Sequence, residues 1–123
     1  MTYSIDTSAI IGAWRRSYPP DVFPALWGKL EGLIEKGQLI ATEEVLFELE
    51  RKDDDVWRWG RAQATMFVEV DEGIQVLVHT ILTAHPRLLD TRKSRSGADP
   101  FVIALAKARG CTVVTEEKAT NNP

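Results

Sequence analysis

The chain has 123 residues and a net charge of −3, and we expect a single domain with one core over residues 1–123. Its 44% hydrophobic and 27% charged residues are typical of a soluble globular protein, and no apolar run approaches the roughly 18 residues of a membrane span. The acidic balance argues against binding nucleic acid by bulk attraction alone. The single cysteine excludes an internal disulfide and fits a reducing cytoplasm, so we expect a cytoplasmic protein.

The first switch from strand to helix is predicted at Asp6. Residues 2–5 alternate weakly, like a short strand. Asp6, Thr7 or Ser8 is then placed to cap a helix that starts near Ala9. A strand followed at once by a helix is typical of an α/β fold.

A longer helix and a second switch follow the segment YPPD. Pro24 fits only the first turn of this helix, which the apolar spacing extends to Gly37. Its apolar positions are Val22, Leu26, Leu30, Leu33 and Ile34. The segment QLIA, residues 38–41, is a second strand candidate. Thr42 is predicted to cap the next helix, whose first two residues are glutamates that favour its positive end.

Two further helices are predicted in the middle of the chain. Residues 54–64 have a helical pattern and precede a short extended segment. Aromatic residues here lie near arginines, which is also the pattern of a base-stacking surface, but we expect them in the core: Trp57, Trp59 and Phe67. Apolar residues from Ile74 to Leu82 define another helix, which ends near the His85-Pro86 pair.

The C-terminal part combines a buried helix with a buried strand. The apolar run 101–106 leaves little of a helix over 100–109 to face water, and Gly110 ends that helix. The segment CTVVT, residues 111–115, is typical of a strand covered on both faces, with Cys111 packed as a small hydrophobe. Helices alternating with short buried strands predict an α/β fold, a three-layer α/β/α sandwich with a short central parallel sheet.

Acidic residues follow the predicted strands at the edge where parallel sheets bind ligands. Asp6 follows the first strand, and Glu116 and Glu117 follow the last. Glu44 and Glu48 share one face of the helix after the second strand. These segments, together with the start of the buried helix at Asp99, can converge on one edge of the sheet.

Each acid also has a purely structural interpretation. Asp6 and Asp99 are good helix caps, the latter with Pro100 at the first helical position. Glu48 is spaced to pair with Lys52, and the two C-terminal glutamates could be surface residues. Taken together, however, acids at one sheet edge repel one another unless a cation is present. Carboxylates without His or Cys suit Mg²⁺ or Mn²⁺, and such a pocket is typical of phosphodiester chemistry.

Four segments resemble, in order and spacing, the acidic blocks of PIN domains, a family of metal-dependent nucleases: YSIDTSAI, the glutamate of VLFELERK, GADPFVIALAKARG and TVVTEE. Residues 23–54 also look like a bacterial PIN-like subfamily long carried as a domain of unknown function. The resemblance covers essentially the whole chain. PIN domains usually continue past the fourth acid with another strand and often a helix, whereas only KATNNP follows here. We therefore expect that a C-terminal strand or helix is missing from this fold.

The resemblance implies which residues are catalytic and bind metal: Asp6, Glu48, Asp99 and Glu117. The fourth position departs from the family, because PIN domains have Thr, any residue and then Asp where this chain has Thr115, Glu116 and Glu117. Either glutamate is therefore a candidate for the fourth acid. The implied auxiliary residues are Glu44, Glu116, Thr7, Ser8 and Thr115.

The resemblance further implies a Mg²⁺- or Mn²⁺-dependent ribonuclease. It is expected to act as the toxin of a toxin–antitoxin pair, with RNA as substrate, a protein antitoxin as partner and a homodimer as a further expectation. Basic residues between the last two helices are either a solvated loop or contacts to RNA phosphates: Arg92, Lys93 and Arg95. The alternative is a catalytically inactive PIN-like module that binds RNA or protein.

Overall fold

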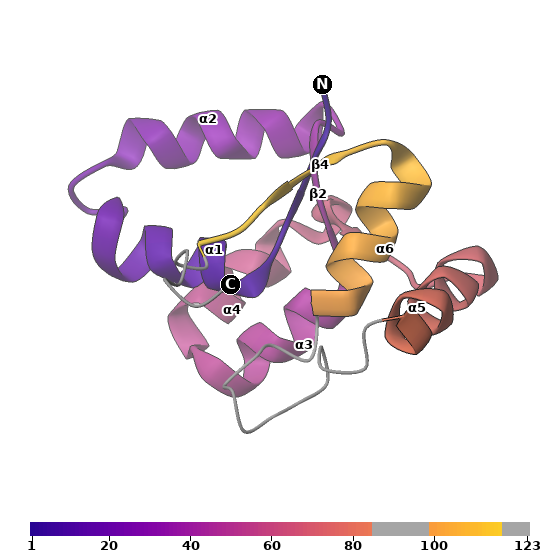
Figure 1. Cartoon of the computed structure of the whole chain (residues 1–123). Helices are drawn as coiled ribbons and strands as arrows, with labels where there is room; N and C mark the ends of the chain where they lie inside the picture. The colour runs from indigo at the N-terminus through magenta and orange to yellow at the C-terminus, as the bar shows by residue number, and fades with distance from the viewer. Residues whose placement is uncertain (85–98, 117–123) are drawn as a thin grey trace, which may run out of the picture.

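A parallel sheet lies between two layers of helices in the computed structural model, which describes residues 1–84 and 99–116, apart from the side chain of Asp99 (Figure 1). The sheet has the strand order β3-β2-β1-β4, and all neighbouring pairs are parallel. Its strands are β1 (Tyr3–Ile5), β2 (Leu39–Thr42), β3 (Phe67–Val68) and β4 (Thr112–Val114). The predicted three-layer α/β/α sandwich is thus confirmed.

The helices divide into two groups, one on each face of the sheet (Figure 1). The first group covers one face with α1 (Thr7–Gly12), α2 (Pro24–Glu35), α3 (Glu43–Lys52) and α4 (Asp54–Ala62). A π-helical turn, η1 (Ala13–Ser17), continues α1, and a short 3-10 turn, η2 (Ala64–Met66), precedes β3. The opposite face is covered by α5 (Glu72–Ala84) and α6 (Asp99–Arg109).

The central strand β2 divides the core because successive side chains of a strand point to opposite faces. Leu39 and Ala41 belong to the apolar cluster under the first group of helices, whereas Ile40 belongs to the cluster under α5 and α6. In β1, the buried Ser4 faces α6, and its hydroxyl donates to the carbonyl of Val102 at 3.2 Å. Both faces of β2 are therefore covered, as is typical of the inner strands of parallel sheets.

Local signals set the starts of the helices. Asp6, one of the three predicted candidates, caps α1, which begins at Thr7 rather than near Ala9. Thr42 caps α3 by accepting from the backbone N–H of Glu44 at 3.0 Å. Pro24 lies in the first turn of α2 as predicted. The prediction that Val22 belongs to this helix is wrong: it lies in a preceding turn and is 65% exposed. Proline disfavours helical conformation in the residue before it, so the helix cannot extend back past Phe23.

The aromatic residues of the middle segment lie against the core, as expected. Trp57, Trp59 and Phe67 pack at the edge of the first apolar cluster. The ring of Trp59 stacks edge to face on Trp27, with centroids 5.0 Å apart, and its indole N–H donates to Glu31. Helix α4, which carries Trp57 and Trp59, ends at Ala62, slightly earlier than predicted, and Phe67 lies in β3.

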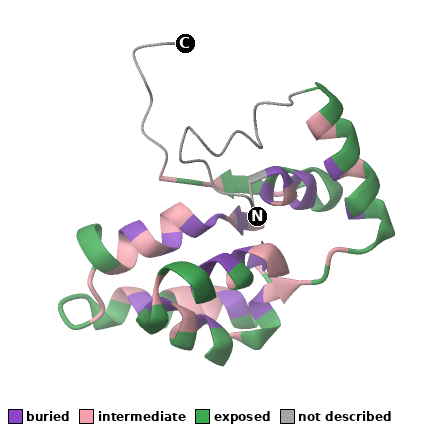
Figure 2. Cartoon of the chain, turned by 90° about the horizontal axis from the view of Figure 1, so that it is seen from below, coloured by how far each residue is buried: buried purple, intermediate pink, exposed green. Residues whose placement is uncertain are grey.

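Two predictions for the C-terminal part are wrong. The strand β4 is not covered on both faces: Thr112 is exposed and Val113 is 37% exposed (Figure 2). Its position explains this exposure, because β4 lies at an edge of the described sheet and pairs with β1. Helix α6 is also less buried than expected, because Ile103 is 39% exposed on the face turned away from the sheet.

Candidate functional site

The carboxyl ends of β1, β2 and β4 meet at one edge of the sheet, where the sequence predicts a site. Parallel pairing places Ile5 opposite Val114, and the backbone N–H of Asp6 donates to the carbonyl of Val114 at 3.0 Å. Residues that follow β1 therefore lie beside residues that follow β4. The helices α1 and α3, which start directly after β1 and β2, contact each other at the same edge.

Asp6 is both a helix cap and a buried carboxylate at this edge. Its side chain is 4% exposed, and Oδ1 accepts hydrogen bonds from the backbone N–H of Ala9 and the hydroxyl of Ser8, each at 2.9 Å. The positive end of α1 stabilises the negative charge. The capping and site interpretations of Asp6 are thus compatible, because the cap places the carboxylate at the sheet edge.

Glu48 is the second buried carboxylate, and Thr7 contacts it. Glu48 is 3% exposed, and its Oε1 accepts from the hydroxyl of Thr7 at 2.5 Å across 41 residues of sequence. Its Oε2 lies 3.9 Å from Nζ of Lys52, the i,i+4 partner expected from the sequence. The structural interpretation of Glu48 as a salt-bridge partner therefore applies, but it leaves the burial of the carboxylate unexplained. An exposed helix face would allow that pair equally well.

Glu44 lies one turn before Glu48 and is half-buried. Burial raises the pKa of its carboxyl group above the usual value. The negative charges of Glu43 and Glu48 raise it further, whereas Arg51 acts in the opposite direction. Burial first, and the neighbouring acids second, thus disfavour the charged form of Glu44, the predicted auxiliary residue.

The predicted auxiliary hydroxyls join the end of β4 to α1. Ser8 Oγ lies 3.4 Å from Thr115 Oγ1 and accepts from the backbone N–H of Glu116 at 3.4 Å. The Glu116 carboxylate forms an ion pair with Arg16 and lies against Gly12. Gly12 and Arg16 were not among the predicted site residues. The signal that was available is their spacing, four and eight residues after Ser8.

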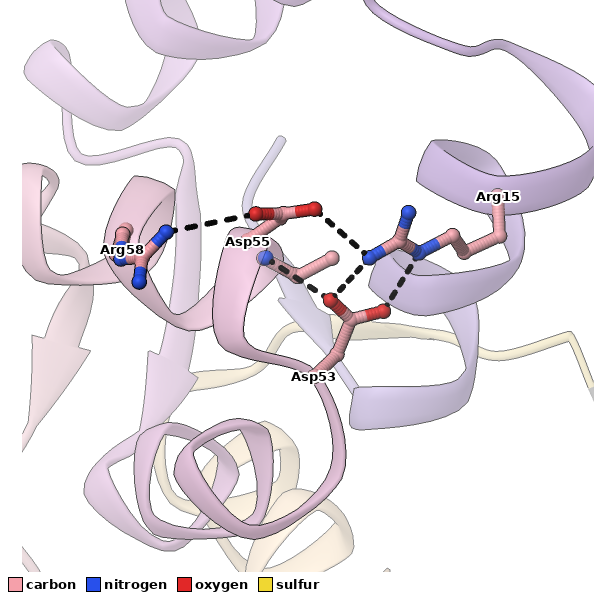
Figure 3. Close-up of polar contacts among 5 residues, drawn as sticks. Arg15, Asp53, Asp55 and Arg58 are labelled. Carbon is pink, nitrogen blue, oxygen red and sulfur yellow. Dashed lines mark hydrogen bonds and ion pairs between the residues drawn. The ribbon is translucent and has the colours of Figure 1, made fainter.

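A second polar cluster joins η1 to the start of α4 (Figure 3). Arg15 forms a two-pronged hydrogen bond with Asp53, at 2.7 and 2.6 Å, and also reaches Asp55, which in turn lies 3.6 Å from Arg58. The hydrogen bond from Arg15 lowers the pKa of Asp53 below its usual value. Asp53 also caps α4, so this cluster holds two helices together. The sequence analysis missed it because nothing local connects the two segments.

The other predicted site residues lie wholly or partly outside the described residues. The backbone of Asp99 starts α6 as predicted, but its side chain lies outside the described part of the chain. Also outside the described residues are Glu117, Arg92, Lys93 and Arg95. Among the residues that the structure describes, no group of three or more His, Cys, Asp and Glu is placed to hold a metal ion. The described part of the site therefore consists of the carboxylates of Asp6 and Glu48 and the hydroxyls around them.

Comparison with known proteins identifies the family of this chain. Within residues 1–84 and 99–116, no helix has both the length and the apolar character needed to cross a membrane. A search of curated proteins finds no match. Residues 3–123 match the model of a domain family whose function is unknown, DUF4411. Because this match spans nearly the whole chain, the protein belongs to the DUF4411 family.

Proposed function

We propose that the protein is a Mg²⁺- or Mn²⁺-dependent ribonuclease of PIN type, with its active site at the carboxyl edge of the sheet. One observation carries this proposal. Asp6 and Glu48 come from different elements and are only 4% and 3% exposed. Thr7 links them, because it is the residue after Asp6 and its hydroxyl donates to Glu48. The same two positions are the first and second acids of the PIN resemblance.

A purely structural role explains this burial less well. A helix cap stabilises a protein by only about 1 kcal/mol, and Ser, Thr or Asn serves as well as Asp. A buried carboxylate loses hydration worth several kcal/mol, which hydrogen bonds and opposite charges must replace. Asp6 accepts hydrogen bonds from Ser8 and Ala9, and Glu48 accepts one from Thr7 and lies near Lys52 among its contacts. Two buried acids at a sheet edge are better explained by a function that needs negative charge there.

The donor chemistry of the described residues fits a hard cation. The side-chain donors at this edge are oxygen atoms: the carboxylates of Asp6 and Glu48 and the hydroxyls of Thr7, Ser8 and Thr115. Mg²⁺ and Mn²⁺ prefer such donors. In the proposal, Asp6, Glu48, Asp99 and Glu117 would hold the ion. When bound, it would supply Lewis-acid chemistry for phosphodiester hydrolysis.

The other residues of the chain have supporting roles in this proposal. Thr7 and Ser8 orient the carboxylates of Glu48 and Asp6 by donating to them. Contact with RNA phosphates would come from Arg92, Lys93 and Arg95, whose positive charges suit a polyanion. The resemblance to PIN toxins supports a protein antitoxin as partner, and dimers are common in that family.

Metal binding and RNA cleavage test the proposal together. We expect the intact protein to bind Mn²⁺ by calorimetry and to cleave single-stranded RNA with Mn²⁺. Asp99→Asn and Glu48→Gln should lose activity by roughly 100-fold or more. Glu50→Gln is the matched control, because Glu50 lies on the same helix as Glu48 but is exposed. Full activity of the Asp99→Asn variant would overturn the assignment. RNA binding without Mn²⁺ binding would instead favour a PIN-like module that does not cleave.

A further inference from the structure

We propose that Glu116 is an anchor that fixes the end of β4 to the first helix, rather than the fourth acid of the metal site. This inference rests on the proposed function for the meaning of a fourth acid, but the anchor itself stands on contacts in the structure. It assigns new roles to Gly12 and Arg16 and leaves Glu117 as the candidate for the fourth acid. The anchor consists of Glu116 together with the residues that hold it, Ser8, Gly12 and Arg16.

Gly12 provides the first line of evidence. Its φ and ψ are −62° and −41°, an ordinary helical conformation that any residue adopts, so the backbone does not require glycine. Inside a helix, glycine is less favourable than alanine by roughly 0.5–1 kcal/mol. A Cβ at this position would lie 1.3 Å from Oε2 and 2.2 Å from Cδ of Glu116. The carboxylate of Glu116 therefore occupies the space that a side chain at position 12 would need.

The neighbours of Gly12 along the helix complete the anchor. Ser8, Gly12 and Arg16 follow one another at intervals of four residues, so they lie along one side of α1 and η1. All of them contact Glu116: Ser8 through the backbone N–H, Gly12 through the carboxylate, and Arg16 through an ion pair. One stripe of the first helix thus holds one residue of the C-terminal segment.

The anchor is connected to the acidic site through the hydroxyl of Ser8. This hydroxyl has one proton, which it donates to Asp6 Oδ1 at 2.9 Å. Its lone pairs then accept from the N–H of Glu116 and from the hydroxyl of Thr115, both at 3.4 Å. The end of β4 is thereby fixed relative to Asp6. A strand of three residues at the edge of the described sheet benefits from such a contact, because β1 is its pairing neighbour there.

The charge of Arg16 also argues against a metal-binding role for Glu116. A divalent cation bound to Glu116 would compete with the guanidinium of Arg16 for this carboxylate. Arg16 would then lie near that cation, with like charges in proximity. The contacts of Glu116 with Arg16 and Gly12 therefore suit a residue that attaches the end of β4 to the first helix.

Stability measurements test the anchor without reference to metal. Gly12→Ala should lower the urea midpoint of the wild type, because the new methyl group displaces the Glu116 carboxylate. In the Glu116→Ala background, the same substitution should raise the midpoint, because the carboxylate no longer occupies that position and alanine favours the helix. Gly28→Ala is the matched control. A Cβ at Gly28 in α2 meets nothing within 4 Å, so this substitution should raise the midpoint in both backgrounds. Gly12→Ala with the same sign in both backgrounds would overturn the anchor.

Mn²⁺ titration by calorimetry then distinguishes an anchor from a ligand. If Glu116 is an anchor, Arg16→Met and Glu116→Gln break the same contact and should weaken Mn²⁺ binding by the same factor, below about fivefold. If Glu116 is a ligand, Glu116→Gln should weaken binding by more than roughly tenfold, whereas Arg16→Met should strengthen it by removing a competing cation. That second pattern would overturn the inference. A wild type that binds no Mn²⁺ would contradict the proposed function, while the Gly12 substitutions would still test the anchor.

Discussion

Replacing Thr7 by valine should show how much the buried contact between α1 and α3 stabilises the protein. Thr7 and Glu48 are 1% and 3% exposed, and the hydroxyl donates to the carboxylate at 2.5 Å. Valine has nearly the same shape as threonine but cannot donate. The carboxylate of Glu48 would therefore lose a hydrogen bond in a place where water does not easily replace it.

The expected loss follows from the charge of the acceptor. Hydrogen bonds to charged groups contribute about 1.5–3 kcal/mol, so Thr7→Val should lower the free energy of unfolding by about 2 kcal/mol. In a domain of this size, about 1 kcal/mol shifts the thermal midpoint by roughly 4 °C, which predicts a fall of about 8 °C. Thr7→Ser keeps the donor and loses one buried methyl group, so its loss should be smaller, about 1 kcal/mol.

Urea and thermal unfolding, followed by circular dichroism, measure both variants. A third variant, Glu48→Gln, provides the double-mutant cycle, because its amide oxygen still accepts but carries no charge. In that background, the loss caused by Thr7→Val should fall to about 1 kcal/mol, the value of a neutral hydrogen bond. The reasoning is refuted if Thr7→Val is as stable as the wild type, or if its loss is identical in the Glu48→Gln background.

Three further predictions concern the core and two titrating groups. Leu49→Ala should lower the free energy of unfolding by about 2–5 kcal/mol in urea, because Leu49 is fully buried in the larger cluster; a smaller loss would mean that the site collapses around the cavity. Arg15 lowers the pKa of Asp53, so the stability that Asp53 contributes is present above its unfolded pKa and disappears as the pH falls through the folded value. Asp53→Asn, which keeps the cap, should thus destabilise the protein at about pH 7, and its stability should converge with that of the wild type in acid. Urea titrations at both pH values check this. In an Arg15→Ala background, the effect of Asp53→Asn should be smaller. Burial raises the pKa of Glu44, so its charge is unfavourable above the folded pKa and has no effect below the unfolded value. Glu44→Gln should therefore stabilise the protein slightly at about pH 7 and leave it unchanged near pH 4, and a loss of stability at about pH 7 would contradict the assigned cause.

The sequence predicts those parts of the fold that depend on neighbouring residues. Asp6 and Thr42 cap helices because a short polar side chain reaches the N–H groups two or three residues further on, and this geometry is local. The parallel sheet follows from the alternation of strands and helices. The location of Glu48 on α3 follows in turn, because this helix starts where β2 stops.

The parts that the sequence does not predict depend on contacts between distant segments. The segment around Val113 would be apolar and β-branched at any position in a sheet. Its composition therefore does not reveal that β4 lies at an edge of the sheet formed by the described strands. The ion pairs of Arg15 with Asp53 and of Arg16 with Glu116 join residues 38 and 100 positions apart, and no local pattern marks them. The pairing of Thr7 with Glu48 was missed for the same reason, although both residues were candidates.

The π-helical turn η1 gives its two arginines partners in different regions of the molecule. Arg15 contacts the start of α4, and Arg16 contacts Glu116, two residues after the end of β4. Deleting one residue between 13 and 17 would restore an α-helical turn and rotate the preceding residues by about 100° relative to those that follow. At most one of the two ion pairs would survive this rotation. The extra residue of the turn therefore acts as a spacer that couples the docking of α4 to that of the C-terminal segment. A shortened chain should lose the cooperativity between them, which hydrogen exchange would detect as separate opening of the two regions.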